Sequence, residues 1–441
     1  MTEHSQIIAE LQARWPEHQV ARGLGRIEAL VDLLGSPQRG YPVIQIAGTN
    51  GKGSTAIMVD SLLRALGLRT GRFTSPHLER LNERICVDGE PISDYAFDEL
   101  VRDVSPLIEM VDARRIDNTA MTFYEVMTGL AYEAFAQAPV DVAVVEVGMG
   151  GGWDATSVAD AQVAVVCPID FDHTHLLGST LPEIAAEKAG IIKPGSAAVF
   201  AAQAPEAAKV LVERAAQCGA RTYLEGVDFA LLDRQPGVGG QVIRIDAAGG
   251  PLGDLVLPLF GEHMAHNAAL AVAAVEAFLG GKPLAPEVIA EGLERVAAPA
   301  RMEVMRHSPT IVLDTCHNPH GVRATLDAMV EAFDFAPLIG VVAMMRDKDV
   351  DGVLRIMADE MTTVVAAGMR NERALPPGEL AAKAAQAFGP DRVEQAPDMG
   401  SAIDLAVGLA DAAGPGAGIL IAGSVYAAGE ARALLGKENT R

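Results

Sequence analysis

The sequence predicts an α/β protein of two domains, and three observations lead to this fold class. The chain has 441 residues, which is more than one ordinary hydrophobic core accommodates. Its hydrophobic content is 49%, and its 44 glycines separate short apolar runs of the kind found in buried parallel strands. Those runs alternate with helical segments, as in strand–helix–strand units. We therefore expect a first α/β domain over 1–297 and a Rossmann-like α/β domain over 298–441.

The first domain is expected to hold a mostly parallel sheet and a small antiparallel β part. Apolar runs predict its strands at 42–47, 140–147, 163–169 and 197–201. The stretch 220–260 differs, because short apolar runs around glycine turns are typical of antiparallel strands. A helix is expected to follow at about 265–279.

The second domain is expected to start after 296–301, where a proline interrupts the helical periodicity and indicates a linker. Beyond this linker, apolar runs alternate with helical segments, and the runs lie at 311–314, 339–345, 363–368 and 418–423. This alternation predicts a second, mostly parallel sheet whose strands are joined by crossover helices.

The composition excludes several classes of partner. Lys and Arg total 35 against 58 Asp and Glu, so the formal charge is −23 and the surface repels nucleic acid and anionic lipid. No apolar run reaches the roughly 18 residues that span a bilayer, and the N-terminus shows no signal-peptide pattern. The four cysteines are far apart and form no C-x-x-C pair. We expect a cytoplasmic protein with reduced thiols that binds neither nucleic acid nor membrane.

The strongest single motif is a glycine-rich loop between the strand at 42–47 and the helix that follows it. The loop consists of Gly48, Thr49, Asn50, Gly51, Lys52, Gly53 and Ser54. Glycines let backbone N–H groups turn toward an anion, the helix N-terminus adds partial positive charge, and Lys52 adds a full charge. These features predict a P-loop ATPase-type domain that binds the phosphates of ATP. Gly53 replaces the hydroxyl residue that normally follows the lysine and holds magnesium, so another side chain must supply that ligand.

A second glycine run, at 148–155, fits the dinucleotide pattern G-x-G-x-x-A when it is counted from Gly150. The segment that follows it, 156–162, is too short for the crossover helix of a Rossmann unit. We therefore do not expect NAD or FAD at this run.

The motifs together resemble the Mur-ligase superfamily and, within it, the dihydrofolate synthase/folylpolyglutamate synthase family. Motifs of that family recur almost from end to end, as GTNGKGST (48–55), TSPHL (74–78), TFYE (122–125), VVEVGMGGGWDAT (144–156), DHTHLLG (172–178), EKAGIIKPG (187–195), HNAALA (266–271), ARMEV (300–304), LDTCHNP (313–319) and GSVYAAGEAR (423–432). The peptidoglycan ligases of the superfamily typically carry a UDP-sugar-binding domain before the phosphate loop, whereas fewer than 50 residues precede Gly48 here. The folate branch is therefore the closer resemblance.

The resemblance implies two magnesium sites beside ATP. It puts Glu146, at the end of an apolar strand, and Ser75 on one magnesium, which supplies the hydroxyl missing after Lys52. It puts His173 on a second magnesium, although imidazole alone is a poor ligand for this ion. Lys188 resembles the lysine that the superfamily carbamylates, since a carbamate offers magnesium an oxygen ligand where an ammonium group repels it. On this resemblance, the catalytic residues are Lys52, Lys188, His173 and Glu146.

The resemblance also implies where an acid substrate, dihydropteroate or a reduced folate, is bound. Two segments border it, formed by Thr122, Phe123, Tyr124 and Glu125, and by Trp153, Asp154 and Ala155. An aromatic ring in the first segment can stack on a flat pterin. The second segment departs from a common family form, because Gly152 stands where many members have arginine and Ser157 where many have asparagine. The missing cation leaves the affinity and the identity of the substrate open.

Further positions are matched in both domains. Asn267 matches the position that recognises adenine, since an amide pairs with both donor and acceptor edges. Arg301 and Asp314 match residues that contact the phosphates and the ribose of the nucleotide. His317 and Ser424 are expected to contact the incoming glutamate.

We therefore expect an ATP-dependent amide-bond ligase. ATP would phosphorylate the carboxylate of the acid substrate, and the amine of L-glutamate would attack the resulting acyl phosphate. The motifs leave open whether the enzyme makes dihydrofolate, extends the glutamate tail of tetrahydrofolate polyglutamates, or does both. Two other hypotheses also stay open: a ligase of the same superfamily for a UDP-linked or unusual acid, and a P-loop switch or degenerate binding protein that forms no amide. A monomer that binds only small-molecule substrates is expected.

Overall fold

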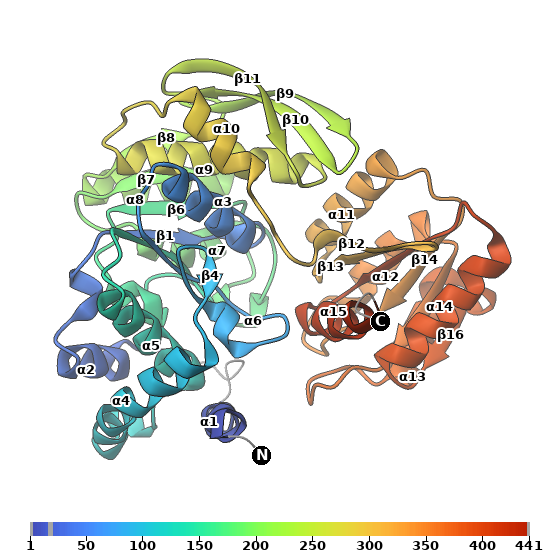
Figure 1. Cartoon of the computed structure of the whole chain (residues 1–441), viewed down its shortest axis with the longest axis horizontal. Helices are drawn as coiled ribbons and strands as arrows, with labels where there is room; N and C mark the ends of the chain where they lie inside the picture. Colours follow the sequence, from blue (N-terminus) through green and yellow to red (C-terminus); the bar gives the residue numbers. More distant parts are fainter. Residues whose placement is uncertain (1–2, 16–20, 439–441) are drawn as a thin grey trace. The chain divides into compact units, whose positions relative to one another are not determined.

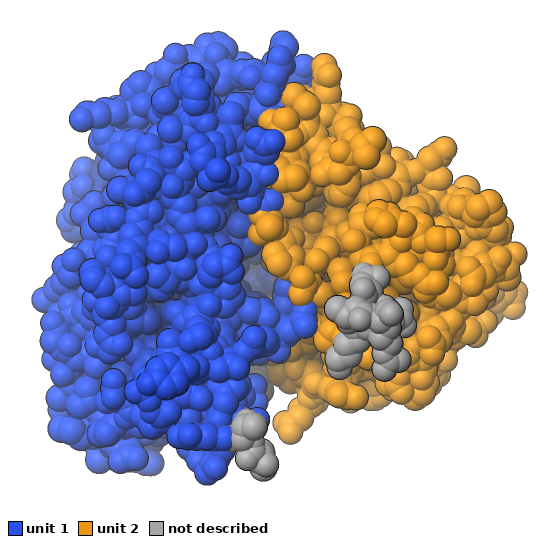
Figure 2. Space-filling view, viewed as in Figure 1, with its two compact units in different colours: residues 1–233, 243–255, 265–296 blue, residues 234–242, 256–264, 297–441 orange. Residues whose placement is uncertain are grey.

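The computed structural model describes residues 3–15 and 21–438 of the chain. It divides into two compact units (Figure 2), of which the first holds residues 1–233, 243–255 and 265–296 and the second holds residues 234–242, 256–264 and 297–441. The main break along the chain lies at 296/297, and two short segments before it also group with the second unit. The domain division expected from the sequence, at 297/298, puts these two segments in the first domain. That division stays a prediction.

The first unit is built on an eight-stranded sheet with the order β4-β3-β2-β5-β1-β6-β7-β8. Its strands are β1 (Val43–Ala47), β2 (Thr70–Phe73), β3 (Ile85–Val87), β4 (Glu90–Pro91), β5 (Val142–Glu146), β6 (Val163–Val166), β7 (Ala197–Phe200) and β8 (Arg221–Leu224). β2, β5, β1, β6, β7 and β8 run parallel, and β3 and β4 extend one edge antiparallel. Every residue of β1 is buried between β5 and β6, including Gln45, as a mostly apolar run predicts for a central parallel strand. The phosphate loop therefore leaves the sheet between these two neighbours.

Helices cover both faces of this sheet and bury their apolar sides in separate core clusters. They are α1 (Glu3–Gln12), α2 (Gly25–Leu33), α3 (Lys52–Ala65), α4 (Asp94–Ala113), α5 (Phe123–Gln137), α6 (Thr174–Leu177), α7 (Leu181–Lys188), α8 (Pro205–Cys218), α9 (Glu262–Phe278) and α10 (Pro286–Glu294). α2, α4 and α5 gather in one group (Figure 1), in a cluster with Phe73 of β2 and Val145 of β5. α7 and α8 share another cluster with Val166 of β6 and Phe200 of β7.

A small three-stranded sheet, with the order β11-β10-β9, interrupts the α/β pattern. It contains β9 (Ala230–Gly237), β10 (Gly240–Ala247) and β11 (Gly250–Leu257). Two residues join each strand to the next, and connections this short permit only antiparallel neighbours. These strands form the antiparallel part expected within 220–260.

The second unit contains a six-stranded sheet with the order β12-β13-β17-β14-β15-β16. Its strands and helices are β12 (Arg301–His307), β13 (Thr310–Asp314), α11 (Pro319–Ala332), β14 (Leu338–Val342), α12 (Val350–Glu360), β15 (Thr363–Ala367), α13 (Pro377–Phe388), β16 (Val393–Ala396), α14 (Met399–Ala413), β17 (Gly418–Ala422) and α15 (Val425–Glu438). Only β12 runs antiparallel to its neighbour in this sheet. The predicted fold class is confirmed in both units.

Some strand limits differ from those expected. β6 ends at Val166 rather than at 169, because Pro168 has no N–H to continue the ladder and its carbonyl oxygen is used by the phosphate loop. β5 starts at Val142 rather than at 140, and β14 ends at Val342 rather than at 345. In both places the apolar run of the sequence extends beyond the strand. Within the part of the chain that the structure describes, no helix is both long and apolar enough to cross a membrane.

Candidate functional site

Two glycines of the phosphate loop allow its close packing. Gly48 and Gly51 have φ angles of 147° and 87°, which L side chains rarely adopt. A Cβ atom on Gly48 would lie 2.6 Å from the Cβ of Cys167, and one on Gly51 would lie 2.8 Å from Oδ1 of Asn267. The loop therefore turns directly against the end of β6 and against α9.

Part of the loop backbone is hydrogen-bonded within the protein. The N–H groups of Thr49 and Asn50 both donate to the carbonyl oxygen of Pro168, at 2.9 and 3.4 Å, and the Thr49 hydroxyl lies 2.9 Å from the carbonyl oxygen of Asp170. α3 then begins with Gly51 as its N-cap residue and without a side-chain cap. The donors that this loop offers an anion are therefore the N–H groups in the first turn of α3.

Two lysines converge on one carbonyl oxygen of the loop. Nζ of Lys52 donates to the carbonyl oxygens of Gly48 and Thr49 at 3.1 and 3.2 Å, and Nζ of Lys188 donates to that of Gly48 at 2.8 Å. Among the described residues, neither lysine forms an ion pair with a carboxylate. Lys188 ends α7 and is buried, and its burial, together with the charge of Lys52, lowers its pKa to about 7. Two lysines without carboxylate partners, of which Lys188 is only partly protonated near pH 7, form a site suited to a polyanion.

Glu146 and Ser75 are brought together at the end of β5. Glu146 is buried, and its Oε2 accepts a hydrogen bond from the backbone N–H of Ser75 at 3.1 Å. Glu146 ends β5, which runs parallel to β1, the strand from which the phosphate loop starts. A carboxylate and a hydroxyl are oxygen ligands of the kind Mg²⁺ prefers beside phosphate oxygens. This donor set fits one magnesium ion.

The second expected magnesium site does not fit the side chains as they stand. His173 has a φ angle of 50°, and its Nε2 lies 3.8 Å from Oδ2 of Asp172. Over residues 3–15 and 21–438, no group of three or more His, Cys, Asp or Glu side chains is arranged to hold a metal ion. An imidazole nitrogen and the ammonium group of Lys188 are not ligands that magnesium prefers.

Two residues of the TFYE segment stabilise the start of α5. The Thr122 hydroxyl accepts from the N–H of Glu125 at 3.1 Å, and the Glu125 carboxylate accepts from the N–H of Thr122 at 2.7 Å. This reciprocal pair is a capping box. Buried Glu125 also accepts from Nε of Arg26, which is 1% exposed, at 3.0 and 3.1 Å. Thr122 and Glu125 thus have structural partners that account for them.

The two aromatic residues of the same segment differ in exposure. Phe123 is buried, and the guanidinium carbon of Arg84 lies 5.1 Å from its ring centroid. Tyr124 is partly exposed, and its hydroxyl lies 3.4 Å from the carbonyl oxygen of Glu146. Of the two aromatic residues, Tyr124 is therefore the one whose hydroxyl lies next to Glu146, which is expected to bind magnesium.

The loop that carries Trp153 and Asp154 is organised from within. Gly150 has a φ angle of 71°, and a Cβ atom there would lie 2.5 Å from Cζ2 of Trp153. The buried Asp154 carboxylate accepts from the N–H groups of Met149 and Thr156, both at 3.0 Å. Burial nevertheless raises the pKa of this carboxyl to about 6, against the effect of those hydrogen bonds. Ala155 is buried where a short 3-10 helix begins.

The two departures from the family form in this loop have different surroundings. The Ser157 hydroxyl is buried, donates to the carbonyl oxygen of Gly151 at 2.7 Å and accepts from Nε2 of Gln45 at 3.0 Å. Gly152 is only half-buried, and a Cβ atom there would meet nothing closer than Cα of Gly190 at 3.3 Å. Ser157 therefore anchors the loop, whereas a Cβ atom at Gly152 would press on the backbone of Gly190.

In the second unit, Arg301 and Asp314 face one another across β12 and β13. The buried carboxylate of Asp314 accepts from the N–H groups of Met302 and Cys316, at 3.0 and 2.8 Å, and from the Thr325 hydroxyl at 3.2 Å. Asp314 thus holds the backbone at the carboxyl end of β13 in place.

The two residues expected to contact glutamate lie at the ends of adjacent strands. His317 follows β13, and its Nδ1 is 3.0 Å from the carbonyl oxygen of Thr315. Ser424 follows β17 and is buried, and its hydroxyl accepts from the N–H of Tyr426 at 3.2 Å. β13 and β17 are parallel neighbours, so both residues belong to the carboxyl edge of this sheet.

Sequence reasoning did not identify two residues next to the predicted site. Arg26 is the buried partner of Glu125, but a single arginine in an amphipathic helix gives no such signal. Burial lowers the pKa of His263, while the charge of Asp314 raises it and the charge of Arg301 lowers it further. His263 lies three residues before the HNAALA motif and outside it.

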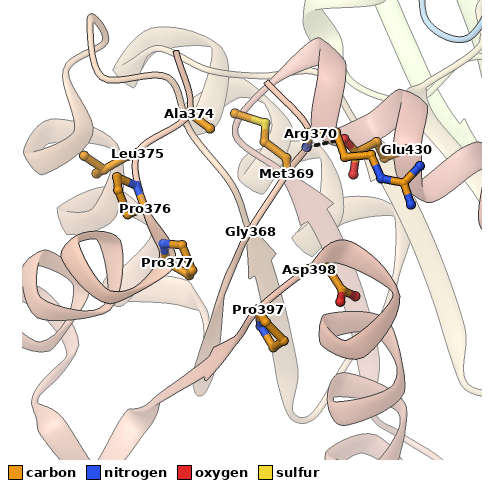
Figure 3. Close-up of a pocket in the computed structure, with 10 residues that line it drawn as sticks. All are labelled: Gly368, Met369, Arg370, Ala374, Leu375, Pro376, Pro377, Pro397, Asp398 and Glu430. Atoms are coloured by element: carbon orange, nitrogen blue, oxygen red, sulfur yellow. Dashed lines mark hydrogen bonds between the residues drawn. The ribbon is translucent and has the colours of Figure 1, made fainter. Parts of the chain in front are cut away.

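A cavity of about 210 Å³ lies at the carboxyl ends of β15 and β16 (Figure 3). It is lined by Gly368, Met369, Arg370, Ala374, Leu375, Pro376, Pro377, Pro397, Asp398 and Glu430, none of them a predicted site residue. Figure 3 shows the Glu430 carboxylate bonded to the backbone N–H of Arg370, whose side chain extends away from Pro376 and Pro377. With two carboxylates and one arginine in its lining, this cavity is unsuited to a polyphosphate.

Comparisons with known proteins agree with one another. The chain matches the models of the Mur ligase middle domain over residues 46–275 and of the Mur ligase, glutamate ligase domain over residues 300–425. The dihydrofolate synthase/folylpolyglutamate synthase of Mycobacterium tuberculosis is 46% identical over 97% of this chain and 93% of its own length. The solved Mycobacterium tuberculosis folylpolyglutamate synthase complexed with ADP matches with a TM-score of 0.95, 46% identity and 98% of both chains covered. Escherichia coli FolC in complex with DHPP and ADP matches with a TM-score of 0.86, 27% identity and 99% of both chains covered.

Proposed function

The chain belongs to the Mur ligase family, in its dihydrofolate synthase/folylpolyglutamate synthase branch, and from this premise we propose that it is an ATP-dependent ligase for L-glutamate. The acid that it activates is dihydropteroate, the γ-carboxyl group of a tetrahydrofolate polyglutamate, or both. The relatives whose names and complexes carry these activities and nucleotides cover nearly the whole chain.

One observation carries the proposal. Lys52 and Lys188 converge on the carbonyl oxygen of Gly48 without a carboxylate partner among the described residues, and Glu146 ends the strand beside β1. Phosphoryl transfer to a carboxylate brings two anions together, so it requires positive charge that is already in place, which Lys52 supplies whether Lys188 is an amine or a carbamate. A glycine-rich turn that binds no anion would not require such a positive charge.

In the mechanism that we propose, Lys52 and the first turn of α3 bind the phosphates of ATP. The substrate carboxylate attacks the γ-phosphorus in line, so an oxygen–phosphorus bond forms as the bond to ADP breaks. The neutral amine of glutamate then attacks the acyl carbon, the amide bond forms, and phosphate leaves. No covalent bond to the enzyme is needed, and buried Cys316 takes no part.

The remaining matched residues bind and orient the substrates in this proposal. Asn267 contacts adenine, Arg301 the phosphates and Asp314 the ribose. His317 and Ser424 contact the incoming glutamate. The aromatic ring of Tyr124 and the loop around Trp153 border the pterin-bearing acid.

Magnesium held by the oxygens of Glu146 and Ser75 would neutralise charge on the phosphates. For a second ion we propose His173 together with Lys188 in its carbamylated form. The neutral amine of Lys188 adds to the carbon of CO₂ and loses a proton, which gives a carbamate with two oxygen donors. The pKa of about 7 supports this step, because a large share of the amine is neutral at physiological pH. The monomeric state and the cytoplasmic location stay predictions.

The test is ATP- and magnesium-dependent amide formation from L-glutamate, with dihydropteroate and tetrahydrofolate offered in separate reactions. The products are identified by mass spectrometry together with the release of ADP. Product from one acid or from both assigns the synthase step, the tail-extending step, or a bifunctional enzyme. ATP binding without product from either acid contradicts the proposal, and activity on UDP-muramoyl compounds would then move the chain to another branch of the superfamily.

A further inference from the structure

A proline ends β6 directly beside the phosphate loop. β6 pairs with β7 up to Val166 and Phe200, and the N–H of Ala201 still donates to the carbonyl oxygen of Val166 at 3.0 Å. The ladder cannot continue through Pro168, which has no N–H to donate to the next strand. The backbone groups on either side of this proline therefore need partners other than the backbone of β7.

The side chain of Gln203, which follows β7, supplies those partners. Its Oε1 accepts from the N–H of Ile169 at 3.0 Å, and its Nε2 donates to the carbonyl oxygen of Cys167 at 3.1 Å. A longer contact of 3.5 Å joins Nε2 to the carbonyl oxygen of Val166. One primary amide thus takes the place of a peptide group, with an acceptor for the residue after the proline and a donor for the residue before it. Sequence reasoning assigned this glutamine no role.

The contact with Gln203 turns the chain at Cys167. The N–H of Cys167 donates to the carbonyl oxygen of Ala47 in β1 at 2.8 Å, but its own carbonyl oxygen points to Gln203, and β1 and β7 lie on opposite sides of β6. After this turn, the carbonyl oxygen of Pro168 is directed to the phosphate loop, where it accepts from two backbone N–H groups. Gln203 therefore holds the backbone on both sides of the carbonyl group that supports this loop.

The phosphate loop is packed closely against this supported backbone. A Cβ atom on Gly48 would lie 2.6 Å from Cβ and 3.1 Å from the carbonyl oxygen of Cys167. The Thr49 hydroxyl lies 2.9 Å from the carbonyl oxygen and 3.0 Å from the backbone nitrogen of Asp170. The carbonyl oxygen of Gly48 in turn accepts from the two lysines of the site. A shift of residues 167–170 would therefore displace the loop and the point at which the lysines converge.

We infer that Gln203 is a positioning residue for ATP: its amide bridges the gap that Pro168 leaves between β6 and β7, and so fixes the backbone on which the phosphate loop rests. This inference rests on the proposed function. Within the part of the chain that the structure describes, all hydrogen bonds of the Gln203 side chain go to backbone groups of residues 166–169. Gln203 thus acts on the nucleotide through the loop, and the proposed site of the acid substrate does not depend on it.

The experiment measures the binding of ATP and of the acid separately in the full chain. Titration with ATP and magnesium, without the acid, gives the Kd of the nucleotide, and steady-state kinetics gives the KM for ATP and for the acid. Gln203→Ala loses both hydrogen bonds, and we expect the Kd and the KM for ATP to rise about tenfold while the KM for the acid changes less than about twofold. Tyr41→Phe is the matched control, because it removes the buried hydrogen bond to the carbonyl oxygen of Tyr132 and should leave the Kd for ATP unchanged.

Gln203→Glu tests the donor group of the amide by itself. At high pH the introduced carboxylate still accepts from the N–H of Ile169, but it has no proton to donate to the carbonyl oxygen of Cys167. Once it is protonated, the carboxyl group donates to that oxygen as the amide does. The ratio of its Kd for ATP to that of the wild type should therefore fall at least about threefold when the pH is lowered from about 8 to about 5.5.

Several charged groups act on this backbone or lie on the segments next to it: Glu146, Lys52, Lys188, Asp170, Glu206 and the Glu225–His266 pair. All of them are also present in the wild type, so the ratio of the two Kd values removes their own titration. Gln203→Ala has no group to protonate at this position, and its ratio to the wild type should stay constant over the same pH range. If Gln203→Ala does not fold, Gln203→Met, which keeps the length of the side chain without its amide, takes its place.

The inference is overturned if Gln203→Ala binds ATP as tightly as the wild type, or if its KM for the acid rises as much as its KM for ATP. It is also overturned if Tyr41→Phe weakens ATP binding to the same extent, or if the ratio for Gln203→Glu does not change with pH. A wild type that binds ATP and forms no amide with either acid is a different result. It contradicts the proposed function, whereas the Kd for ATP still measures the role of Gln203.

Discussion

The carboxyl edges of the two parallel sheets use charged side chains in opposite ways. After β1, Lys52 and Lys188 donate to backbone carbonyl oxygens and have no carboxylate partner among the described residues. After β13, Asp314 accepts from two backbone N–H groups and a hydroxyl, so its charge is met by donors of the same unit. Both edges begin at the carboxyl end of a strand that runs parallel to a neighbour, β1 in the first unit and β13 in the second.

The difference shows what each edge is suited to do. An edge with uncompensated cations binds a polyanion, and its charged groups gain their main interaction only when that ligand arrives. An edge whose carboxylate already accepts hydrogen bonds from its own unit keeps one loop geometry with or without ligand. Substitution at the first edge should therefore impair catalysis, and substitution at the second should first reduce stability.

Lys52→Ala should produce the largest effect. Removing one preorganised charge from a transition state costs about a hundredfold or more in kcat, and Lys52 is the cation closest to the start of α3. Steady-state kinetics with ATP as the varied substrate measures the loss. Lys209→Ala, at an exposed lysine of α8, is the control and should be silent. A Lys52→Ala enzyme that keeps a third of the wild-type rate would contradict the contrast between the two edges.

Asp314→Asn should reduce stability at the second edge. The Asn amide replaces one acceptor oxygen by an NH₂ group that faces a backbone or hydroxyl donor, which costs about 1–3 kcal/mol when the donor is buried. Urea unfolding measures the loss, and Asp359→Asn at an exposed position of α12 is the control. Unchanged unfolding in Asp314→Asn would show that the hydrogen bonds around Asp314 do not hold this edge.

Asp154 provides a further test of this comparison. It is a buried carboxylate of the first unit, and like Asp314 it accepts hydrogen bonds from backbone N–H groups. Burial raises the pKa of Asp154 in the folded state from 3.8 to about 6, so between these values the folded state binds more protons than the unfolded state. Its contribution to stability therefore falls as the pH rises, and between pH 4.5 and 7 the loss is about 2 kcal/mol. The free energy of unfolding of the wild type minus that of Asp154→Asn should decrease by that amount over this range. A difference that is constant or increases with pH would be the contrary result.

The smallest expected effect concerns a segment that groups with the second unit. Nη1 and Nη2 of Arg234 lie 2.6 and 2.7 Å from the two carboxylate oxygens of Glu331 in α11. A partly exposed bidentate pair of this kind contributes at most about 1 kcal/mol. Arg234→Ala should lower the stability by no more than this amount in urea unfolding, whereas Arg244→Ala, at the more exposed pair with Asp254, should have no effect. Equal losses of unfolding free energy in the two variants would mean that the pair of Arg234 with Glu331 stabilises the protein no more than the exposed pair of Arg244 with Asp254.

Much of the candidate site could be proposed before the structure. The strand–glycine loop–helix pattern identifies Gly48 and Lys52 because all parts of a phosphate loop lie within a dozen residues. The resemblance to the Mur ligases, confirmed by the comparisons, also selects Lys188 and Asp314. It could not show that buried Glu125 is paired with Arg26, because these two residues lie 99 positions apart in the sequence.

The sequence by itself determined the alternation of strands and helices, the two sheets and the phosphate loop, because periodicity and turn chemistry are local properties of the chain. Only the tertiary structure decided which side chains are buried and which meet. Lys188 has a pKa of about 7 because folding removes it from water beside Lys52, and Glu125 gains the buried Arg26 as its partner because the fold packs α2 against α5. Desolvation and the distance between charges depend on contacts between segments far apart in the sequence, and no local pattern encodes them.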